Sequence, residues 1–597
     1  MKTISGKNLS DTIETTLAVA TRGLAELRDP DGGWTGRLSS SALSTATAVR
    51  ALACVDSQAH EQLISAGRKW LADHVNEDGA WGDTPQSLSN LPTTLLVWSA
   101  LAGEASDVIG GAERWLTDRI GSLEPKRIAA ALADIYGADR TFAAPILTMC
   151  AISGRLGDGP EAWGLVPPLP FELATLPHKS FSILGMPVVS YALPALIAIG
   201  QVRHFHKPSR NPAVRMMRNL ARHRTLKKLK KIQPLGGGFL EAAPLTSFVA
   251  MSLASAGLAD HAVTNACVGF LTSNVRSDGS WPIDTNLATW VTTLSVNALS
   301  IGAPLDETDT GTIADWLIDQ HYTDIHPYTN SAPGGWAWSP LSGAVPDGDD
   351  TAGAMIALHN LAPEDPKVIE AVAAGAKWLV DLQNRDGGIP TFCRGWGKLP
   401  FDHSCPDITA HALGAWGVWR ESFDRVLTAK VQRASERAIK YLVDQQRDDG
   451  SWRPLWFGNE AATDQANPTY GTARVLYGLS QASADIPPGM LRRGGEWLLS
   501  AQNDDGGWGG DISLASSIEE TALAIDALLC VGDITPEVEA GAAWLVEHTD
   551  NGQAFAPAAI GLYFAKLWYY EELYPRIFTI SALNRFLAKR PAIRENQ

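Results

Sequence analysis

The chain has 597 residues, of which 45% are hydrophobic and 19% charged, so it can form two large domains and is not a disordered protein. Its formal net charge of −16 argues against a nucleic-acid partner for the chain as a whole. No CxxC pair occurs among the six cysteines, and no apolar run at the N-terminus is long enough for a signal peptide, so reduced thiols on the cytosolic side are expected.

A repeated unit organises most of the chain. An apolar helix is followed by an Asp-Gly turn, which ends in Trp in all but one case, and then by a helix rich in Thr and Ala. The turns are at residues 31–34, 78–81, 278–281, 386–389, 449–452 and 505–508. Apolar residues at helical spacing on both sides predict a helical hairpin for each unit, and glycine supplies the positive φ that ends the first helix. Such hairpins cannot bury their apolar faces alone, so six of them are expected to close into an α/α barrel.

The repeats also suggest how the chain is divided. The pattern is clear from about residue 15 to 120 and again from about 270 to the end, with irregular sequence between. It predicts an all-α protein of two α/α barrels. Residues 1–270 are expected to form the N-terminal barrel, and residues 271–597 are expected to form the C-terminal barrel.

A segment from about residue 180 to 232 combines an apolar part with a basic part. Residues 181–200 carry no charge and are interrupted by Gly185, Pro187 and Pro194, and residues 203–231 then carry 11 Lys and Arg. An apolar surface beside basic residues is typical of monotopic docking on an anionic membrane. A buried hairpin with a solvated charged face, a transmembrane helix and a grip for a substrate diphosphate remain as alternatives.

Two further segments carry chemistry. Gly-Gly-Trp-Ala-Trp at 334–338 is followed by Val-Pro-Asp347-Gly-Asp349-Asp350, and Pro-Asp407-Ile-Thr-Ala-His411 comes later. Seen alone, the acidic group is typical of an exposed helix N-cap, and a His on an apolar helix is typical of a satisfied core residue.

In their order, these segments resemble the squalene–hopene cyclase family. The family's QW repeat is similar to residues 376–388 and 496–508, and its GGFAF and DxDD segments are similar to 334–338 and 345–352. Its EDVTAH segment is similar to 406–411, and its closing helix to 574–583. The resemblance implies a βγ-type double barrel whose C-terminal barrel is catalytic. It implies a class II terpene cyclase, which protonates a linear polyprenyl substrate, most readily squalene or a related triterpene, and so starts a carbocation cascade.

The resemblance also implies a role for each acidic residue. Protonating an isolated alkene needs a stronger acid than an ordinary Asp, whose pKa is about 3.9. Asp349 is expected to donate the proton with support from Asp347 and Asp350. His411 is expected to orient and acidify Asp349, and Asp407 is expected to hold His411. Metal-driven ionisation of a diphosphate uses DDxxD, which the sequence lacks, so no metal and no other cofactor are expected.

Aromatic rings are expected to line the substrate pocket, because a desolvated ring stabilises a cation by up to about 2 kcal/mol without acting as a nucleophile. By match to family positions, the nominated residues are Trp290, Trp338, Trp456, Tyr470, Tyr563 and Tyr574, with Trp336 behind the acid. The Trp residues of the Asp-Gly turns are expected to serve the turns. Glu241, in apolar surroundings, is a candidate terminal base, with an ordinary helix-end Glu as the alternative.

The chain departs from the family at several positions. Leu567 stands where the family has a mid-cavity Phe, and Glu571 stands where it has a Tyr. The loop at 389–392 is shortened, and residues 238–244 lack the Gln that holds the terminal water. These differences predict that stabilisation of the cation and termination differ from hopene formation, and they fit a shorter, partly cyclised or differently substituted prenyl chain. Membership would also imply a peripheral protein on the cytoplasmic side of the cell membrane, with a homodimer as a further possibility.

Three other functions remain open. A diterpenyl-diphosphate or meroterpenoid cyclase would use the same chemistry on another substrate. A zinc protein-prenyltransferase β subunit is suggested by Asp402, His403 and Cys405, with Cys393 nearby. Side chains of adjacent residues diverge, however, so a tetrahedral site there is poor. A non-enzymatic helical repeat protein is the third; its thioester version is excluded because no Cys-Gly-Glu-Gln occurs.

Overall fold

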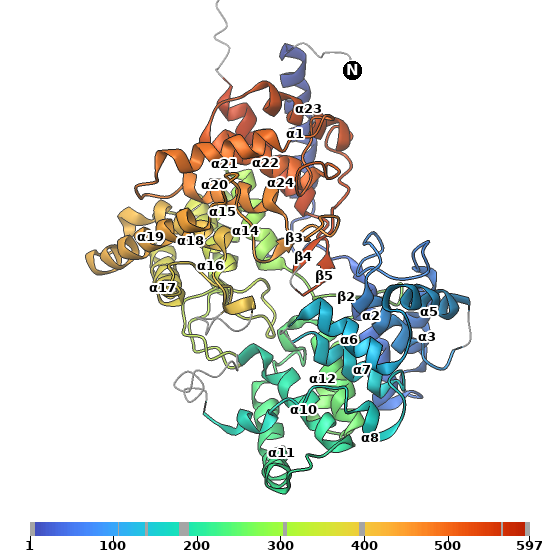
Figure 1. Cartoon of the computed structure of the whole chain (residues 1–597). Coiled ribbons are helices and arrows are strands. Elements are labelled where there is room, and N and C mark those ends of the chain that lie inside the picture. The colour runs from blue at the N-terminus through green and yellow to red at the C-terminus, as the bar shows by residue number, and fades with distance from the viewer. Residues whose placement is uncertain are drawn as a thin grey trace, which may run out of the picture.

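The structure is a computed structural model, and it is almost entirely helical (Figure 1). It describes residues 6–104, 107–137, 141–177, 190–301, 307–392, 400–562 and 565–590. The described strands have only two or three residues each. The prediction of an all-α protein with two α/α barrels is confirmed.

The C-terminal barrel has an inner ring in which each helix packs against the next and the last packs against the first. The ring consists of α14 (Ala288–Leu299), α16 (Gly348–Leu361), α18 (Pro406–Val418), α20 (Pro468–Ser480), α22 (Ile518–Val531) and α24 (Tyr574–Lys589). The helices outside it are α15 (Glu307–Asp319), α17 (Pro366–Leu382), α19 (Arg425–Gln445), α21 (Pro488–Ser500), α23 (Pro536–His548) and α1 (Gly6–Ala25). The inner helices are buried over almost their whole length, which explains their uniformly small and apolar sequences.

Helix α1 belongs to this barrel although it is the first element of the chain. It packs against α23 and α24, and its side chains Leu9, Ile13 and Leu24 lie in the same buried cluster as those of the C-terminal helices. Trp316 Nε1 of α15 donates to Asp31 Oδ2 at 3.2 Å, in the turn that follows α1. This differs from an assignment of all of residues 1–270 to the N-terminal barrel; the division near residue 270 itself stays a prediction.

The N-terminal barrel has its own closed ring of inner helices and a separate buried cluster. The ring consists of α2 (Ala42–Asp56), α4 (Leu91–Ala100), α7 (Ala143–Ile152), α10 (Leu193–His206) and α12 (Ala243–Ser255). Outside it lie α3 (Glu61–Asp73), α5 (Asp107–Ile120), α6 (Pro125–Tyr136), α11 (Pro212–Ile232) and α13 (Ala262–Ser273). Shorter helical turns in this part of the chain are α8 (Gly159–Ala162), η1 (Phe171–Thr175), η2 (Ser190–Ala192) and η3 (Phe239–Glu241). Two more, η4 (Pro400–Asp402) and η5 (Arg420–Ser422), lie in the C-terminal part.

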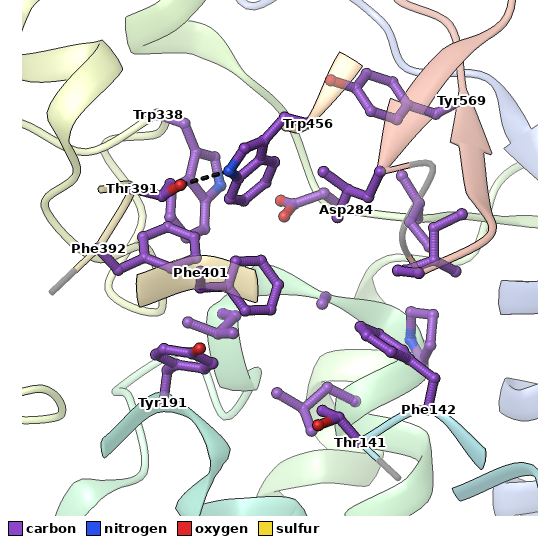
Figure 2. A pocket seen from close by; sticks show the side chains of 18 of the residues that line it. Thr141, Phe142, Tyr191, Asp284, Trp338, Thr391, Phe392, Phe401, Trp456 and Tyr569 are labelled. Atoms are coloured by element: carbon purple, nitrogen blue, oxygen red, sulfur yellow. Dashed lines mark hydrogen bonds between the residues drawn. The ribbon is translucent and has the colours of Figure 1, made fainter. Parts of the chain in front are cut away.

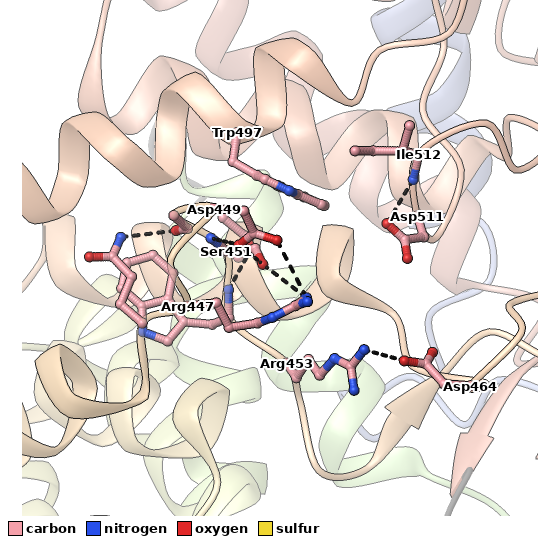
Figure 3. Close-up of polar contacts among 12 residues, drawn as sticks. Arg447, Asp449, Ser451, Arg453, Asp464, Trp497, Asp511 and Ile512 are labelled. Atoms are coloured by element: carbon pink, nitrogen blue, oxygen red, sulfur yellow. Dashed lines mark hydrogen bonds and ion pairs between the residues drawn. The ribbon is translucent and has the colours of Figure 1, made fainter.

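The Asp-Gly turns hold each hairpin by a repeated set of hydrogen bonds, and Figure 3 shows the turn at Asp449. Asp449 Oδ1 accepts from Ser451 N at 2.9 Å and from Ser451 Oγ at 2.7 Å. Trp452 Nε1 then donates to Leu442 O at 2.8 Å, and Trp452 N donates to Thr472 Oγ1 at 3.0 Å. The same pair of bonds, to the Leu ten residues earlier and to a Thr of an inner helix, is made by Trp34, Trp81, Trp281 and Trp508. These rings are buried and serve the turns.

Two small antiparallel sheets join the barrels. Strand β1 (Ser40–Ser41) pairs with β2 (Trp281–Pro282), so the two chain crossings between the barrels run side by side. Strands β3 (Phe457–Gly458), β4 (Ile560–Leu562) and β5 (Leu567–Tyr569) form the second sheet, which lies where the two halves meet (Figure 1). Trp568 N of β5 donates to Asp83 Oδ2 of the N-terminal barrel at 2.7 Å.

None of the described helices combines the length and the apolar character needed to cross a bilayer. Of the apolar run at 181–200, residues 181–189 lie outside the described residues, and the rest forms η2 and the start of α10.

Candidate active site

The acidic cluster begins helix α16. Asp347 is the N-cap residue, and its Oδ1 accepts hydrogen bonds from the backbone N–H groups of Asp349 and Asp350, each at 2.9 Å. Asp347 N in turn donates to Trp336 O at 3.0 Å. The cluster is therefore fixed from both sides, and its carboxyl groups lie at the positive end of the helix dipole.

Asp349 and His411 are in direct contact. His411 lies on α18, which packs beside α16, and its Nδ1 is 2.6 Å from Asp349 Oδ1. The side chain of His411 is 5% exposed and that of Asp349 is 15% exposed, so the pair is largely out of water. The ring of Trp290 meets the imidazole edge-on at 6.1 Å between centroids.

Burial sets the protonation of this cluster. It raises the pKa of Asp347 to about 7, and burial together with the Asp347 charge raises the pKa of Asp350 well above its usual range. Both effects favour the neutral form of Asp350, which limits the negative charge beside Asp349. Burial lowers the pKa of His411, while the charge of Asp349 and the hydrogen bond to it act in the opposite direction.

The role expected for Asp407 is not met. Its Oδ1 accepts a hydrogen bond from Cys405 Sγ at 2.6 Å, and its Oδ2 is buried without a hydrogen-bond partner among the described residues. Asp407 therefore does not hold His411, because the thiol that precedes α18 is the group within reach. Burial and the charge of Asp349 raise the pKa of Asp407 to about 6.

A half-buried cation near the acid was missed in the sequence. Arg474 on α20 lines a small pocket together with His411, and neither residue is among those that line the main cavity. Burial lowers the pKa of Arg474, but the nearby Tyr470 and Asp349 outweigh this and raise it, so the guanidinium stays charged. The sequence did contain one indication of this site, because Arg474 is the one charged residue of α20. No recognised motif includes it.

A large apolar cavity, part of whose wall is drawn in Figure 2, is lined by residues of both barrels. Asp347, Asp349 and Asp350 also lie in its wall, so the cavity reaches the acidic cluster. The rest of its wall is almost entirely aliphatic and aromatic. Of the nominated rings, Trp290, Trp338, Trp456 and Tyr574 line it. The wall also contains rings that were not nominated from the sequence, which are Tyr136, Phe142, Tyr191, Phe248, Phe392, Phe401, Phe457 and Tyr569. Phe401 lies against the rings of Trp456 and Phe392, at 5.0 and 5.3 Å between centroids.

The other nominated residues lie elsewhere. Trp336 is fully buried, and its Nε1 donates to Leu317 O at 2.7 Å, so it makes the bond of a turn Trp. Tyr470 packs on Phe457 at 4.8 Å between centroids and is not in the cavity wall. Glu241 is also outside the wall. Tyr563 is outside the described residues.

The two departures from the family differ in their consequences. Leu567 is in the cavity wall, so its smaller side chain changes the space next to the substrate. Glu571 is fully buried but turned away from the cavity, where its Oε1 accepts from Arg37 N at 2.7 Å and from Leu573 N at 3.2 Å. Glu571 thus ties the start of α24 to the segment that leaves the barrel.

Within the described part of the chain, no group of three or more His, Cys, Asp and Glu side chains is arranged to hold a metal ion. Cys393, one of the residues considered for zinc, lies outside that part.

Comparison with known proteins agrees with the architecture. A family model described as the squalene-hopene cyclase C-terminal domain matches residues 6–100 and 287–588, more than half of the chain. The match resumes near the start of α14 and includes α1, the helix that joins the C-terminal core.

Individual relatives point in two directions. The chain is 28% identical over 331 residues to a probable squalene–hopene cyclase of Sinorhizobium fredii, a match covering 50% of this chain and 49% of that protein. It is 26% identical over 564 residues to a copalyl diphosphate synthase of Streptomyces cyslabdanicus, covering 89% and 90%. The chain spans about a quarter to a half of the length of the curated relatives that match with the highest significance.

One solved structure shows the same fold over nearly the whole chain. The ent-copalyl diphosphate synthase from Streptomyces platensis aligns with a TM-score of 0.56 and 17% identity, covering 97% of this chain and 99% of that one. With the family match over both parts of the C-terminal barrel, these findings show that the chain belongs to the squalene–hopene cyclase family of terpene cyclases.

Proposed function

We propose that this protein is a class II terpene cyclase in which Asp349 protonates the terminal alkene of a linear polyprenyl substrate. The observation that carries the proposal is the 2.6 Å contact of Asp349 with His411 at the edge of an apolar, ring-lined cavity. An acid in such a wall faces mainly apolar side chains, so a bound alkene is the acceptor that lies next to it.

The charges around Asp349 support this role. When the O–H bond of Asp349 breaks, the proton adds to the terminal alkene carbon and a carboxylate remains. His411 is bonded to that carboxylate, and Arg474 supplies a permanent positive charge nearby. Burial and the Asp347 charge raise the pKa of Asp350 and so favour its neutral form at the start of α16. The arrangement therefore stabilises the state that follows proton transfer.

The cavity wall suits a migrating cation. Trp290, Trp338, Trp456 and Tyr569 present rings, each of which stabilises a desolvated cation by about 2 kcal/mol at most. The side chains facing the substrate offer few nucleophiles, so the cascade can proceed from ring to ring before it ends.

An uncharged polyprenyl chain such as squalene is the substrate that the described wall favours. No Lys or Arg side chain lines the cavity in the described ranges, so no cation is in place there for a diphosphate. A prenyl diphosphate is the second candidate, since the copalyl diphosphate synthase resembles this chain over 89% of its length.

The test is conversion of three substrates by the purified protein, with products identified by mass spectrometry. Squalene, geranylgeranyl diphosphate and a prenylated aromatic compound are each incubated with the wild type and with Asp349→Asn. Cyclised product from squalene alone supports the first candidate, and product from the diphosphate alone supports the second. No product from any of them would overturn the proposal.

Docking on the cytoplasmic face of an anionic membrane is a further part of the proposed function. Helix α11 is rich in Lys and Arg, yet Met216 and Leu220 are 64% and 69% exposed on its surface. Exposed apolar side chains among basic ones are typical of a helix lying in a membrane interface, where a water-insoluble polyene is supplied. A homodimer stays a prediction.

A further inference from the structure

One carboxyl group in the cavity wall has no part in starting the reaction. Asp284 lies between β2 and α14, and Figure 2 shows its carboxyl group directed into the cavity. Its Oδ1 is buried and has no hydrogen-bond partner among the described residues. Leaving a buried polar atom unpaired destabilises a protein, so an unpaired carboxyl oxygen in a cavity wall points to a use in binding or chemistry.

The neighbouring Glu241 is fixed and has no free oxygen. Its Oε1 accepts from Gly343 N at 2.7 Å, and its Oε2 accepts from Thr285 Oγ1 at 3.1 Å. Thr285 N also donates to Glu241 O at 3.2 Å, so the segments carrying the two acids are paired. Of these two carboxyl groups, Asp284 is the one that faces the substrate.

We propose that Asp284 is the base that ends the cascade, by removing a proton from a carbon next to the last cation. This inference rests on the proposed function. The C–H bond breaks, its electron pair forms a C=C bond, and the proton goes to Oδ1 of Asp284. Asp349 supplied one proton and Asp284 removes one, so the product is an isomer of the substrate. Asp284 then releases its proton to water, and Asp349 regains one from water.

The position of Asp284 predicts an early end to the cascade. Burial raises the pKa of Tyr569, and the charges of Glu571, Asp284 and Asp349 all add to this effect. Asp284 and Asp349 both line the cavity, and Asp284 comes shortly before Trp290, whose ring meets the imidazole bonded to Asp349. We expect a base in this part of the wall to meet the cation after few rings have formed, which agrees with the loss of a family ring at Leu567.

The electrostatic surroundings make the base pH-dependent. Burial and the charge of Glu241 raise the pKa of Asp284 well above its usual range, although the nearby backbone N–H groups of Thr285 and Asn286 and the Trp338 side chain act in the opposite direction. The other titratable groups nearby are Tyr569 and Asp349, and Tyr322 beside Glu241. Because the folded pKa is raised, the carboxylate that accepts the proton forms only as the pH increases. The share of proton-loss product should therefore rise with pH in the wild type.

The test compares Asp284→Asn with the wild type on the substrate that the wild type converts. Asn keeps the shape but accepts a proton poorly, so substrate consumption should stay within about threefold while the proton-loss product falls at least tenfold. Products with more rings, or with a hydroxyl from water, should replace it, and their ratio should no longer vary with pH. Glu519→Gln is the control, since Glu519 is a buried carboxyl group of α22 outside the cavity wall.

Three results would overturn the inference. An unchanged product mixture in folded Asp284→Asn would show that another group removes the proton. Complete loss of substrate consumption in that folded variant would place Asp284 in initiation instead. If the variant does not fold, a wild-type product ratio that is constant from pH 5 to 9 would refute the raised-pKa base. An inactive wild type on all substrates would instead refute the proposed function itself.

Discussion

His411 Nδ1 and Asp349 Oδ1 are 2.6 Å apart, although the two residues are separated by 62 positions in the chain. The contact exists because α16 and α18 are neighbours in the inner ring; Asp349 lines the cavity, whereas His411 does not. The contact brings together an acid, a histidine that is hydrogen-bonded to it and an apolar cavity. Alkene protonation requires all three.

Replacing Asp349 by Asn should remove the acid and leave the fold intact. A positioned general acid contributes about 10²- to 10⁴-fold to rate, so cyclised product should fall by at least the lower figure in a steady-state assay. Asp381→Asn is a matched control, because Asp381 is an exposed carboxylate on α17 paired only with Lys377. Activity within twofold of the wild type in Asp349→Asn would contradict the assignment.

Arg474→Met should lower kcat about tenfold and leave KM unchanged. Loss of a unit charge several ångströms from the Asp349 carboxylate costs about 1–2 kcal/mol at the effective dielectric of protein interiors. KM should not move, because Arg474 is not in the cavity wall. Arg474→Lys should restore part of kcat, which a purely structural role would not require. A folded Arg474→Met variant with normal kcat would exclude this electrostatic role.

Asp350→Asn should change how stability depends on pH. The folded pKa of Asp350 is raised by burial and by Asp347, so the wild type binds this proton more tightly folded than unfolded. The contribution of this proton to the free energy of unfolding is fully present below the pKa of the unfolded state. It is lost as the pH rises through the pKa of the folded state. The variant, which has no such proton, should match the wild type near pH 4 and exceed it at pH 8.5 in urea unfolding. Parallel stability curves for the two proteins would contradict this.

Replacing Met216 and Leu220 together by Ser should weaken membrane docking. Both side chains are well exposed on α11, and their removal takes apolar surface from the helix face without opening the core. Co-sedimentation with phosphatidylserine-containing vesicles should fall several-fold, and binding of the wild type should decrease with salt. Val426→Ser, which changes a 66% exposed residue on α19, should have no effect. Equal binding of both variants would refute a role for α11.

Leu567→Phe should extend the cascade. Leu567 is in the cavity wall, and a ring there would stabilise a later cation by up to about 2 kcal/mol. The ratio of products with more rings to products with fewer rings should rise, as read by mass spectrometry and NMR. Leu499→Phe on α21, outside the wall, controls for a general effect of added volume. A product ratio equal to that of the wild type would show that Leu567 does not limit the cascade.

The helical hairpins and the order of the motifs could be predicted from the sequence alone. Their signals are local: helical spacing of apolar residues, an Asp that accepts hydrogen bonds within its own turn, and a glycine at positive φ, as at Gly450. The position of Asp349 at the start of a helix has the same local origin, since Asp347 caps that helix through groups two and three residues away.

Tertiary structure alone decided which of these pieces meet. Helix α1 joins the core of the distant C-terminal barrel, and Arg474 comes to lie in one small pocket with His411. Asp284 faces the cavity while Glu241 does not. Each outcome depends on how helices far apart in the chain close into rings, and the direction of a side chain across such a ring is set by packing rather than by its neighbours in sequence.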